Sequence, residues 1–474
     1  MAKKLLLINP AQHFKPNLAS VLRLPAAGLG YVAALTPPDW EIKIADENIE
    51  PLTLEDADLV GLTAYTCNVS RAYEISQEYR AKGAKTVIGG VHVSMLYDEA
   101  IRFVDSVVIG EAESVWPSLI RDFEQGELKK SYKGERISLE NQVKPRRDLY
   151  SKKYRLLSVE TSRGCPNDCE FCSVTAFNGH LYRQRPVDQV LDELDSLNTR
   201  YFFFSDDNIL GYGKQAEERA IQLFRGMADR GLKKQWGCYV GIDFANNPEV
   251  LKYAKKAGCL GVFIGLESVN EESLQGMHKV RNLRVGVKNY KAVIKKIHDH
   301  GIGILGSFVL GSDGDKQDVF DRTTEFILDS KIDATQLSIL NPLPGTRLFT
   351  RFQQEGRLLR TNYPDDWKYY DFTNVLFQPR NMTPEELDEG VARMHRNLSS
   401  RTTALKRAFF SVIITKNLPG AAIAYIGNRT AGNLWVKRGG ATYDSTSSDL
   451  KGNYLQHTSS DDDRTKIPII ETRQ

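Results

Sequence analysis

Apolar and polar positions along residues 150–350 alternate in a way that predicts repeated strand and helix units. Short apolar runs precede longer segments with one-face helical spacing, such as the segment in which Tyr290, Ile294 and Ile297 share a face before Gly301. Strands that alternate with helices predict a parallel sheet, and six such units make a partial (β/α)6 barrel resembling an incomplete TIM barrel. The strands are expected at 156–160, 201–205, 237–242, 261–266, 302–310 and 335–340.

The first 145 residues show the same alternation and predict a separate α/β domain with a doubly wound, Rossmann-like sheet. Amphipathic segments near 73–82 and 113–123 connect or follow its strands. The opening apolar run stops at Asn9-Pro10 without a small-residue cleavage site, so we interpret it as a first strand and not as a signal peptide. The strands are expected at 4–8, 41–45, 59–63, 86–89 and 107–109.

The pattern changes beyond about residue 352, where a mainly helical C-terminal extension is expected. Thr383 is suited to cap a helix that begins at Pro384. The end of the chain is rich in Ser, Thr and Asp and is expected to be disordered. The 474 residues therefore divide into an N-terminal domain (1–145), a barrel (146–352), an extension (353–442) and a tail (443–474).

Composition limits the possible classes of protein. The hydrophobic content of 41% is enough for large cores, and no apolar run reaches the roughly 18 residues of a membrane span. The net charge of +3 says little about partners, and no nucleic-acid-binding module is recognisable. Six cysteines, three of them in one loop, fit a reducing cytoplasm. The scattered Cys67, Cys238 and Cys259 are interpreted as small buried hydrophobes.

Three of the cysteines carry the strongest chemical signal in the chain. Cys165, Cys169 and Cys172 have the spacing of a loop that holds one iron–sulfur cluster by three thiolates, and they follow the strand at 156–160. Three thiolates leave one iron without a protein ligand, so the site points to chemistry and not only to structure. A zinc knuckle is the alternative, for which His180 is the only nearby fourth ligand.

The cysteine triplet, with Phe171 before its last member, resembles the signature of the radical S-adenosylmethionine (SAM) superfamily. The resemblance implies a 4Fe-4S cluster whose open iron binds the amino and carboxylate groups of SAM. One electron from the cluster then cleaves SAM to methionine and a 5′-deoxyadenosyl radical, which takes a hydrogen atom from substrate. The resemblance also implies an open barrel whose cleft admits a large substrate.

Polar residues and glycines at the strand ends are where this resemblance places SAM. Asp206 or Asp207, in place of the Gly-Gly-Glu turn of many relatives, is expected to hold the ammonium group, with the choice left open. Glu267 is expected at the ribose and methionine end, with helix capping as its alternative. Segments 306–314 and 341–346 are expected beside the adenosine, although the second could serve only as a turn. The SAM-binding positions expected are Phe171, Asp206, Asp207, Glu267, Ser268, Gly306 and Leu343.

The N-terminal domain, taken with the barrel signature, resembles that of the cobalamin-binding radical SAM subfamily. Doubly wound sheets bind ligands in loops past the carboxyl ends of their strands, and these loops are small, glycine-bearing or polar here. The Asp-x-His-x-x-Gly pattern is missing, so base-off cobalamin without a histidine ligand is expected. His92 is expected to line the nucleotide tail or to lie on a surface loop, and the alternative for the whole domain is a platform without cofactor. The cobalamin-binding positions expected are Thr63, Tyr65, Thr66, Gly89, Gly90, His92, Gly110 and Glu111.

The extension, through 367–372 and 381–387, resembles that of hopanoid methylases and tetrapyrrole-modifying relatives such as the anaerobic cyclases. The expected function is cobalamin-dependent methylation of an unactivated carbon of a lipid-like, tetrapyrrole or other small-molecule substrate. A flavodoxin or ferredoxin is expected as electron donor, and no catalytic acid or base is assigned. The alternatives are a radical cyclase or rearrangement enzyme without methyl transfer, and a non-enzymatic iron–sulfur sensor.

Residues 401–440 contain seven Lys or Arg residues, no Asp or Glu, and several interleaved aromatic residues. A surface of this kind could rest on anionic lipid or grip an acidic substrate, which would make the cytoplasmic protein membrane-associated. A solvated helical face is the equal alternative.

Overall fold

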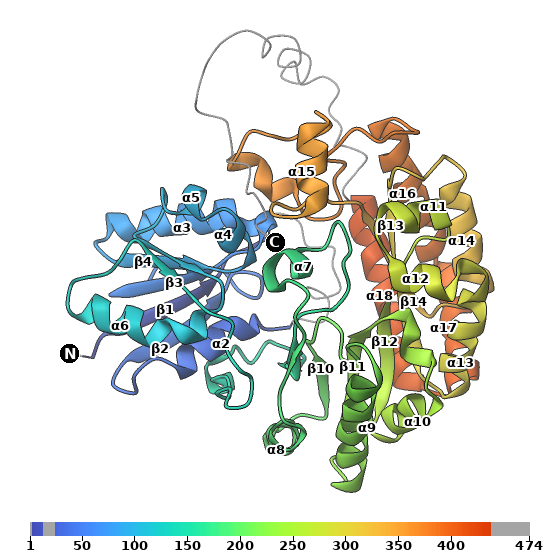
Figure 1. The fold of residues 1–474 in the computed structure, drawn as a ribbon, viewed down its shortest axis with the longest axis horizontal. Helices are drawn as coiled ribbons and strands as arrows, with labels where there is room; N and C mark the ends of the chain where they lie inside the picture. Colours follow the sequence, from blue (N-terminus) through green and yellow to red (C-terminus); the bar gives the residue numbers. More distant parts are fainter. Residues whose placement is uncertain (1, 13–23, 438–474) are drawn as a thin grey trace.

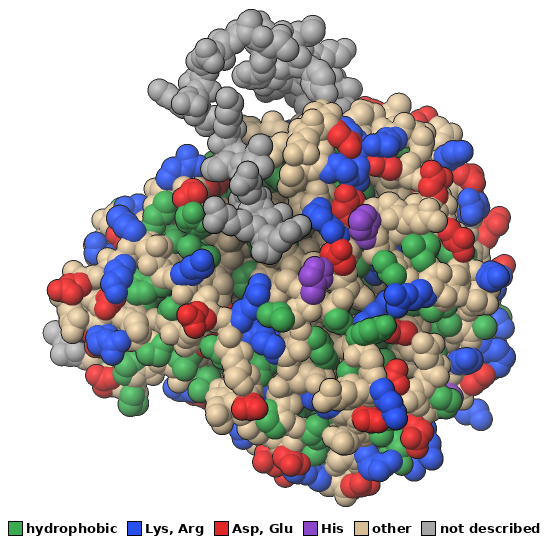
Figure 2. Space-filling view, in the orientation of Figure 1, with side chains coloured by type: hydrophobic (Ala, Val, Ile, Leu, Met, Phe, Trp, Pro, Cys, Tyr) green, Lys and Arg blue, Asp and Glu red, His purple; other side chains and the backbone are tan. Residues whose placement is uncertain are grey.

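The computed structural model describes residues 2–12 and 24–437, with the backbone alone from residue 431, and the expected disordered tail at 443–474 lies outside the described residues. The described chain holds two parallel six-stranded sheets, the N-terminal one blue to cyan in Figure 1 and the barrel green to orange. On the face drawn in Figure 2, basic and acidic side chains are interspersed and form no large area of one sign.

The N-terminal sheet has the strand order β2-β1-β3-β4-β5-β6, and every neighbouring pair is parallel. All five expected strands are present, and β6 is an addition. That strand was missed because it has three residues, of which only Tyr132 is buried. Its strands are β1 (Lys4–Asn9), β2 (Glu41–Asp46), β3 (Leu59–Thr63), β4 (Lys85–Gly89), β5 (Ser106–Ile109) and β6 (Ser131–Lys133).

Successive residues of these strands pack on opposite faces of the sheet. Leu5 and Leu7 contribute to the core under α2 and α6, whereas Leu6 and Ile8 contribute to the core under α3 and α4. Because both faces are covered, the central strands β1 and β3 contain continuous apolar runs. The helices are α2 (Ala27–Ala34), α3 (Val69–Ala81), α4 (Val91–Met95), α5 (Tyr97–Ala100) and α6 (Trp116–Glu124).

The second sheet has the order β14-β13-β12-β11-β10-β7, parallel throughout, and confirms the six expected barrel strands. Its strands are β7 (Leu157–Val159), β10 (Tyr201–Phe204), β11 (Gln235–Val240), β12 (Cys259–Glu267), β13 (Gly303–Leu310) and β14 (Ala334–Ile339). The helices outside it are α8 (Val187–Ser196), α9 (Lys214–Asp229), α10 (Pro248–Lys256), α13 (Tyr290–Asp299) and α14 (Val319–Asp329).

The C-terminal extension packs on both sheets. It comprises the 3-10 helix η6 (Asp365–Tyr369), α16 (Pro384–Ser399), α17 (Arg401–Thr415) and α18 (Leu418–Lys437), and α15 (Arg347–Gln354) spans its expected start. The expected cap of α16 is confirmed, because the Thr383 side chain accepts from the Glu386 N–H and the Glu386 carboxylate accepts from the Thr383 N–H. Trp367 and Tyr370 join the core of the N-terminal domain, so the extension fastens that domain to the barrel.

Candidate functional site

The three cysteines of the triplet line one cavity at the carboxyl ends of the barrel strands. They lie between the short strand β8 (Ser162–Arg163) and α7 (Ser173–Asn178). Gly164 starts their loop with a φ of 89°, and a Cβ there would meet the Leu181 carbonyl oxygen at 2.1 Å, so only glycine fits. The cavity measures about 410 Å³, and we call it the cluster cavity. Cys165, Cys169 and Cys172 thus end up where parallel α/β proteins carry their chemistry.

The thiols are held in a partly buried, cation-containing environment. Burial raises the pKa of all three cysteine thiols, and the nearby ammonium of Lys279 opposes that effect. The amide of Asn167 donates to Cys165 Sγ at 3.3 Å.

Asp206 and Asp207 have different surroundings. The difference bears on which of the two carboxylates faces SAM. Asp206 is fully buried and accepts from the Thr161 N–H, the Thr161 hydroxyl and the Ser162 hydroxyl. It lines neither the cluster cavity nor the N-terminal cavity described below, so of the two carboxylates Asp206 is the one set back from the expected SAM position. Asp207 accepts from the Gly164 N–H at 3.0 Å and lines the cluster cavity. Burial raises the pKa of Asp207 to about 6.

Glu267 also lines the cluster cavity, at the end of β12. Its φ of 63° is in the left-handed region, and the β12–β13 register shifts between Gly265 and Glu267. Such backbone costs on the order of 1–3 kcal/mol in a residue other than glycine and is concentrated at functional sites. The carboxylate accepts from Lys279 Nζ at 2.9 Å. Burial alone would lower the pKa of Lys279, but Cys169 and Glu267 together raise it.

Several wall residues of the cluster cavity were not anticipated. Lys279, Arg281 and Arg284 come from the start and body of α12 (Val280–Val285), and Tyr212, Tyr239 and Phe263 add aromatic surface. The basic run at 278–284 is visible in the sequence and could have suggested them. Phe171 lies in this wall as expected. Ser268, Gly306 and Leu343 do not line it: Ser268 accepts from the Asn270 N–H, Gly306 packs against Ile332, and Leu343 packs on the N-terminal core.

A second cavity, of about 420 Å³, lies at the carboxyl edge of the N-terminal sheet, and we call it the N-terminal cavity. It extends down the sheet past Leu7, Gly61 and Val108, beneath Leu29 and Trp116. The strand order reverses between β1 and β3, which is where such sheets bind ligands. The expected residues that line it are Thr63, Tyr65, Gly89, Gly90, Gly110 and Glu111.

His92 and Thr66 lie outside this cavity, so the structure does not bring these two expected positions to its wall. His92 is fully buried, which also overturns the alternative of a surface loop. Its Nδ1 is 3.2 Å from the Thr66 hydroxyl, its Nε2 is 3.4 Å from Glu99, and its ring meets the edge of Trp367. The burial depends on a residue of the C-terminal extension, which explains why the local sequence did not reveal it.

Gly90, next to His92, has a structural role of its own. Its φ is 113°, and a Cβ there would lie 2.5 Å from the Ala64 carbonyl oxygen. Glycine is therefore required by the contact between the loops after β3 and β4, whether or not a ligand is bound. At Gly89, by contrast, a Cβ would have only ordinary contacts, the nearest at 3.6 Å.

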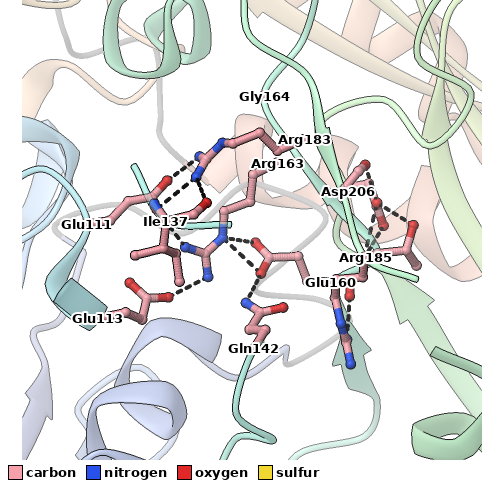
Figure 3. A network of polar contacts seen from close by, with 12 residues as sticks. Glu111, Glu113, Ile137, Gln142, Glu160, Arg163, Gly164, Arg183, Arg185 and Asp206 are labelled. Atoms are coloured by element: carbon pink, nitrogen blue, oxygen red, sulfur yellow. Dashed lines mark hydrogen bonds and ion pairs between the residues drawn. The ribbon is translucent and has the colours of Figure 1, made fainter. Parts of the chain in front are cut away.

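An ion-pair network closes one side of the N-terminal cavity and joins the two sheets (Figure 3). Arg163 contacts Glu113 at 2.5 Å, Glu160 at 3.0 Å and Glu111 at 3.4 Å. Arg183 pairs with Glu111 as well, and the Glu111 carboxylate accepts from the Ile137 N–H. Burial opposes ionisation of Glu111, but Arg183 and Arg163 outweigh it and lower its pKa. Glu111 is thus engaged by the barrel's arginines.

The cluster cavity and the N-terminal cavity share two wall residues, Val174 and Asp207. The cavities therefore meet where α7 and the end of β10 come together. A molecule placed at this junction would touch the contents of both.

Comparison with known proteins identifies the families that the barrel and the N-terminal domain match. Residues 159–327 match the radical SAM superfamily and residues 18–120 match the B12 binding domain. The bacteriochlorophyllide d C-12(1)-methyltransferase of Chlorobaculum tepidum is 32% identical over 85% of this chain and 89% of its own length. The chain belongs to the cobalamin-dependent radical SAM methyltransferase family.

Other members of the family agree in sequence or fold. The hopanoid C-2 methylase of Rhodopseudomonas palustris is 28% identical over 73% of this chain and 68% of its own length. Anaerobic magnesium-protoporphyrin IX monomethyl ester cyclases are among the more distant relatives. The radical SAM methyltransferase TsrM of Kitasatospora setae, solved with cobalamin and a 4Fe-4S cluster, has the same fold, with a TM-score of 0.66 and 16% identity over 91% of this chain and all of its own.

The family uses a 4Fe-4S cluster, SAM and cobalamin, and the residues present fit these groups. Family membership decides between zinc and the cluster in favour of the cluster. The cluster cavity offers three thiols together with carboxylates and an ammonium, which complement the ammonium and carboxylate of SAM. The described wall of the N-terminal cavity contains no histidine or cysteine, which fits cobalamin held without a side-chain ligand to cobalt.

Proposed function

We propose that this chain methylates an unactivated carbon of a tetrapyrrole that carries a carboxylate. The observation that carries the proposal is the shared wall of the two cavities at Val174 and Asp207. When bound, the cluster with SAM supplies hydrogen-atom abstraction from carbon, and cobalamin supplies the methyl group. A substrate carbon at the junction of the cavities is within reach of both.

In this proposal, the residues of the chain bind the cluster and SAM and orient them. Cys165, Cys169 and Cys172 hold the cluster, and Lys279 neutralises part of its charge. Asp207 accepts from the amino group of SAM, while the Glu267–Lys279 pair at 2.9 Å orients the methionine end. The protein accelerates the reaction by holding the reacting groups in fixed positions and by excluding water from reactive intermediates.

The substrate class is supported by the remaining wall of the cluster cavity and by the relatives. Tyr212, Tyr239 and Phe263 offer flat apolar surface, and Arg281 and Arg284 are cations at the same wall. Arg281 lies over the Tyr212 ring at 4.7 Å, so cation and aromatic surface form one unit. A planar macrocycle with a carboxylate matches this combination. The relative that is 32% identical is named for a chlorin substrate.

Product analysis under anaerobic conditions tests the proposal. The full chain would be reconstituted with iron, sulfide and hydroxocobalamin, then incubated with SAM, a chlorophyllide-type substrate and a reducing system of flavodoxin or ferredoxin, the proposed class of electron donor. We expect 5′-deoxyadenosine, S-adenosylhomocysteine and methylated product together. Deoxyadenosine without S-adenosylhomocysteine would contradict methyl transfer and favour the cyclase alternative.

A matched pair of variants supports the interpretation of that assay. Cys165→Ala should lose both nucleoside products, because one ligand of the cluster is gone. Cys259→Ala, at a buried cysteine of β12 outside the cluster cavity, should retain them. Equal activity of the two variants would show that the triplet does not hold the cluster.

A further inference from the structure

The helix α17 is buried on its polar side and exposed on its apolar side. Its buried residues are Ala404, Arg407, Ser411 and Thr415. Its exposed large residues are Leu405, Phe409, Phe410 and Ile413, with 40% to 63% of their surface accessible. A surface helix of a water-soluble domain has the opposite arrangement. Exposed apolar surface that is contiguous, and not scattered, marks an interaction site.

The helix α18 continues the same inversion. Ala421, Ala424 and Asn428 are buried, whereas Leu418 and Ile426 are 68% and 53% exposed. Ile423 is 44% exposed but lines a cavity at the amino ends of the barrel strands. The two helices pack against each other, and each carries exposed apolar side chains. We call this helix pair the hairpin. Its side chains are described for residues 401–430. It lies beside β14 on the side of the barrel away from the N-terminal sheet (Figure 1).

Polar side chains fix which face of the hairpin points inward. They donate to backbone carbonyl oxygens at the amino ends of the barrel strands, the end opposite the cluster loop. The hydrogen bonds run from Arg407 to Ile332 at 3.0 Å, from Asn417 to Leu260 at 3.0 Å and from Asn428 to Asp333 at 2.8 Å. Rotating either helix to bury its apolar side would leave these buried groups without partners, which is costly. The apolar face is therefore held outward.

The charge of the hairpin indicates what covers it. Residues 401–437 contain no Asp or Glu, and Arg401, Lys406 and Lys416 are exposed. Lys331 of the barrel adds its ammonium over the Phe410 ring, 5.1 Å from the centroid. A second copy docked by a two-fold axis would bring these cations toward their counterparts. An anionic lipid surface supplies both the apolar phase and the opposite charge.

We propose that the hairpin docks this protein in the interface of an anionic lipid bilayer. Its apolar side chains enter the boundary between headgroups and acyl chains, and its lysines and arginines contact the headgroups. No helix within the described residues is long and apolar enough to cross a membrane, so the hairpin lies in the interface. The proposal is independent of the substrate proposed above, because the hairpin and the cluster cavity are at opposite ends of the barrel.

Flotation of the purified full chain with vesicles tests this proposal. We expect co-flotation with vesicles of phosphatidylcholine mixed with phosphatidylglycerol, weaker binding to phosphatidylcholine alone, and weakening by salt. The triple variant Phe409→Ser, Phe410→Ser, Ile413→Ser should bind at least about tenfold more weakly, because it removes the apolar anchor. Leu54→Ser, an exposed leucine of the N-terminal domain, is the matched control and should bind like the wild type.

A second variant keeps the test decisive if the triple variant folds poorly. Lys406→Glu reverses one exposed charge. It should weaken binding to the anionic vesicles and leave binding to phosphatidylcholine vesicles unchanged. Failure of the wild type to float with either vesicle would overturn the proposal. So would triple and control variants that bind equally. A wild-type dimer that the triple variant converts to a monomer, without vesicle binding, would assign the hairpin to self-association instead.

Discussion

Asp206 and Asp207 are neighbours in the chain, yet the backbone at the end of β10 directs them to opposite environments. Asp206 is enclosed and accepts hydrogen bonds that hold the start of the cluster loop at Thr161 and Ser162. Asp207 lines the cluster cavity and accepts one N–H, from Gly164. One carboxylate therefore holds the loop and the other faces a ligand, a division that single positions in a sequence do not reveal.

The pKa of Asp207 near 6 predicts a pH-dependent affinity for SAM. An ionised carboxylate accepts hydrogen bonds from the amino group of SAM, and ionisation increases as the pH rises through 6. We expect affinity to rise up to about tenfold per pH unit below that pKa and to level off above it. Isothermal titration of the cluster-loaded chain between acidic and neutral pH measures this.

The two neighbouring substitutions provide the control for this titration. Asp207→Asn should bind SAM more weakly and without the pH dependence. Asp206→Asn should lower thermal stability, because its amide nitrogen would face the Thr161 N–H, but the folded fraction should keep the wild-type pH profile. An Asp207→Asn variant with the wild-type profile would mean that another group sets it.

At the scale of elements, the helix α2 offers a way to test the N-terminal cavity. Gly28 of this helix lines the cavity, and a Cβ there would meet no atom within 4 Å. Gly28→Phe should fold normally and occupy space that cobalamin needs, so we expect loading per chain to fall at least about tenfold by absorbance while the iron content is unchanged.

The smaller substitution Gly28→Ala separates volume from backbone effects. It should load cobalamin like the wild type, because one methyl group fits the open space and alanine favours the helix. If Gly28→Phe also loads fully, cobalamin does not occupy this side of the cavity.

The elements that could be predicted are those whose signals are local. The barrel strands are short, mostly apolar segments between amphipathic helical segments, and the cysteine triplet is contained in one loop. Lys279 was missed because its contact with Glu267 depends on the loop path between β12 and α12. The burial of His92 was missed because Trp367, distant in the chain, covers it. Likewise, the inverted faces of α17 follow from its docking and not from its spacing.

At the scale of the whole molecule, function depends on how the two sheets are held together. The extension contributes Trp367 to the N-terminal core, and Trp367 Nε1 donates to Glu99 at 2.9 Å. On the cavity side, Arg163 and Arg183 of the barrel engage Glu111 of the N-terminal domain. These contacts fix the relative position of the two cavities.

Removal of one buried cation should therefore destabilise the protein in a pH-dependent way. In the wild type, Glu111 has a lowered pKa, so its ionised form stabilises the fold above the unfolded pKa, and this is lost as pH falls. In Arg183→Met the carboxylate stays buried with fewer cations, so its pKa rises. We expect a loss of roughly 3 kcal/mol near neutral pH, partly recovered toward pH of about 5.

Thermal or denaturant unfolding across that pH range checks this prediction. Arg230→Met removes a solvent-accessible pair with Asp192 and is the matched control, with little or no expected change in stability. Equal losses in the two variants would show that the Glu111 contacts do not hold the domains together.

The wall shared by the two cavities makes their binding equilibria a single thermodynamic cycle. A cation beside Asp207 in the cluster cavity keeps that carboxylate ionised, and whatever occupies the N-terminal cavity meets the same charge. The factor by which cobalamin changes the dissociation constant of SAM must therefore equal the factor by which SAM changes that of cobalamin. Two titrations performed in opposite order would give that factor twice, and Asp207→Asn should bring it closer to one.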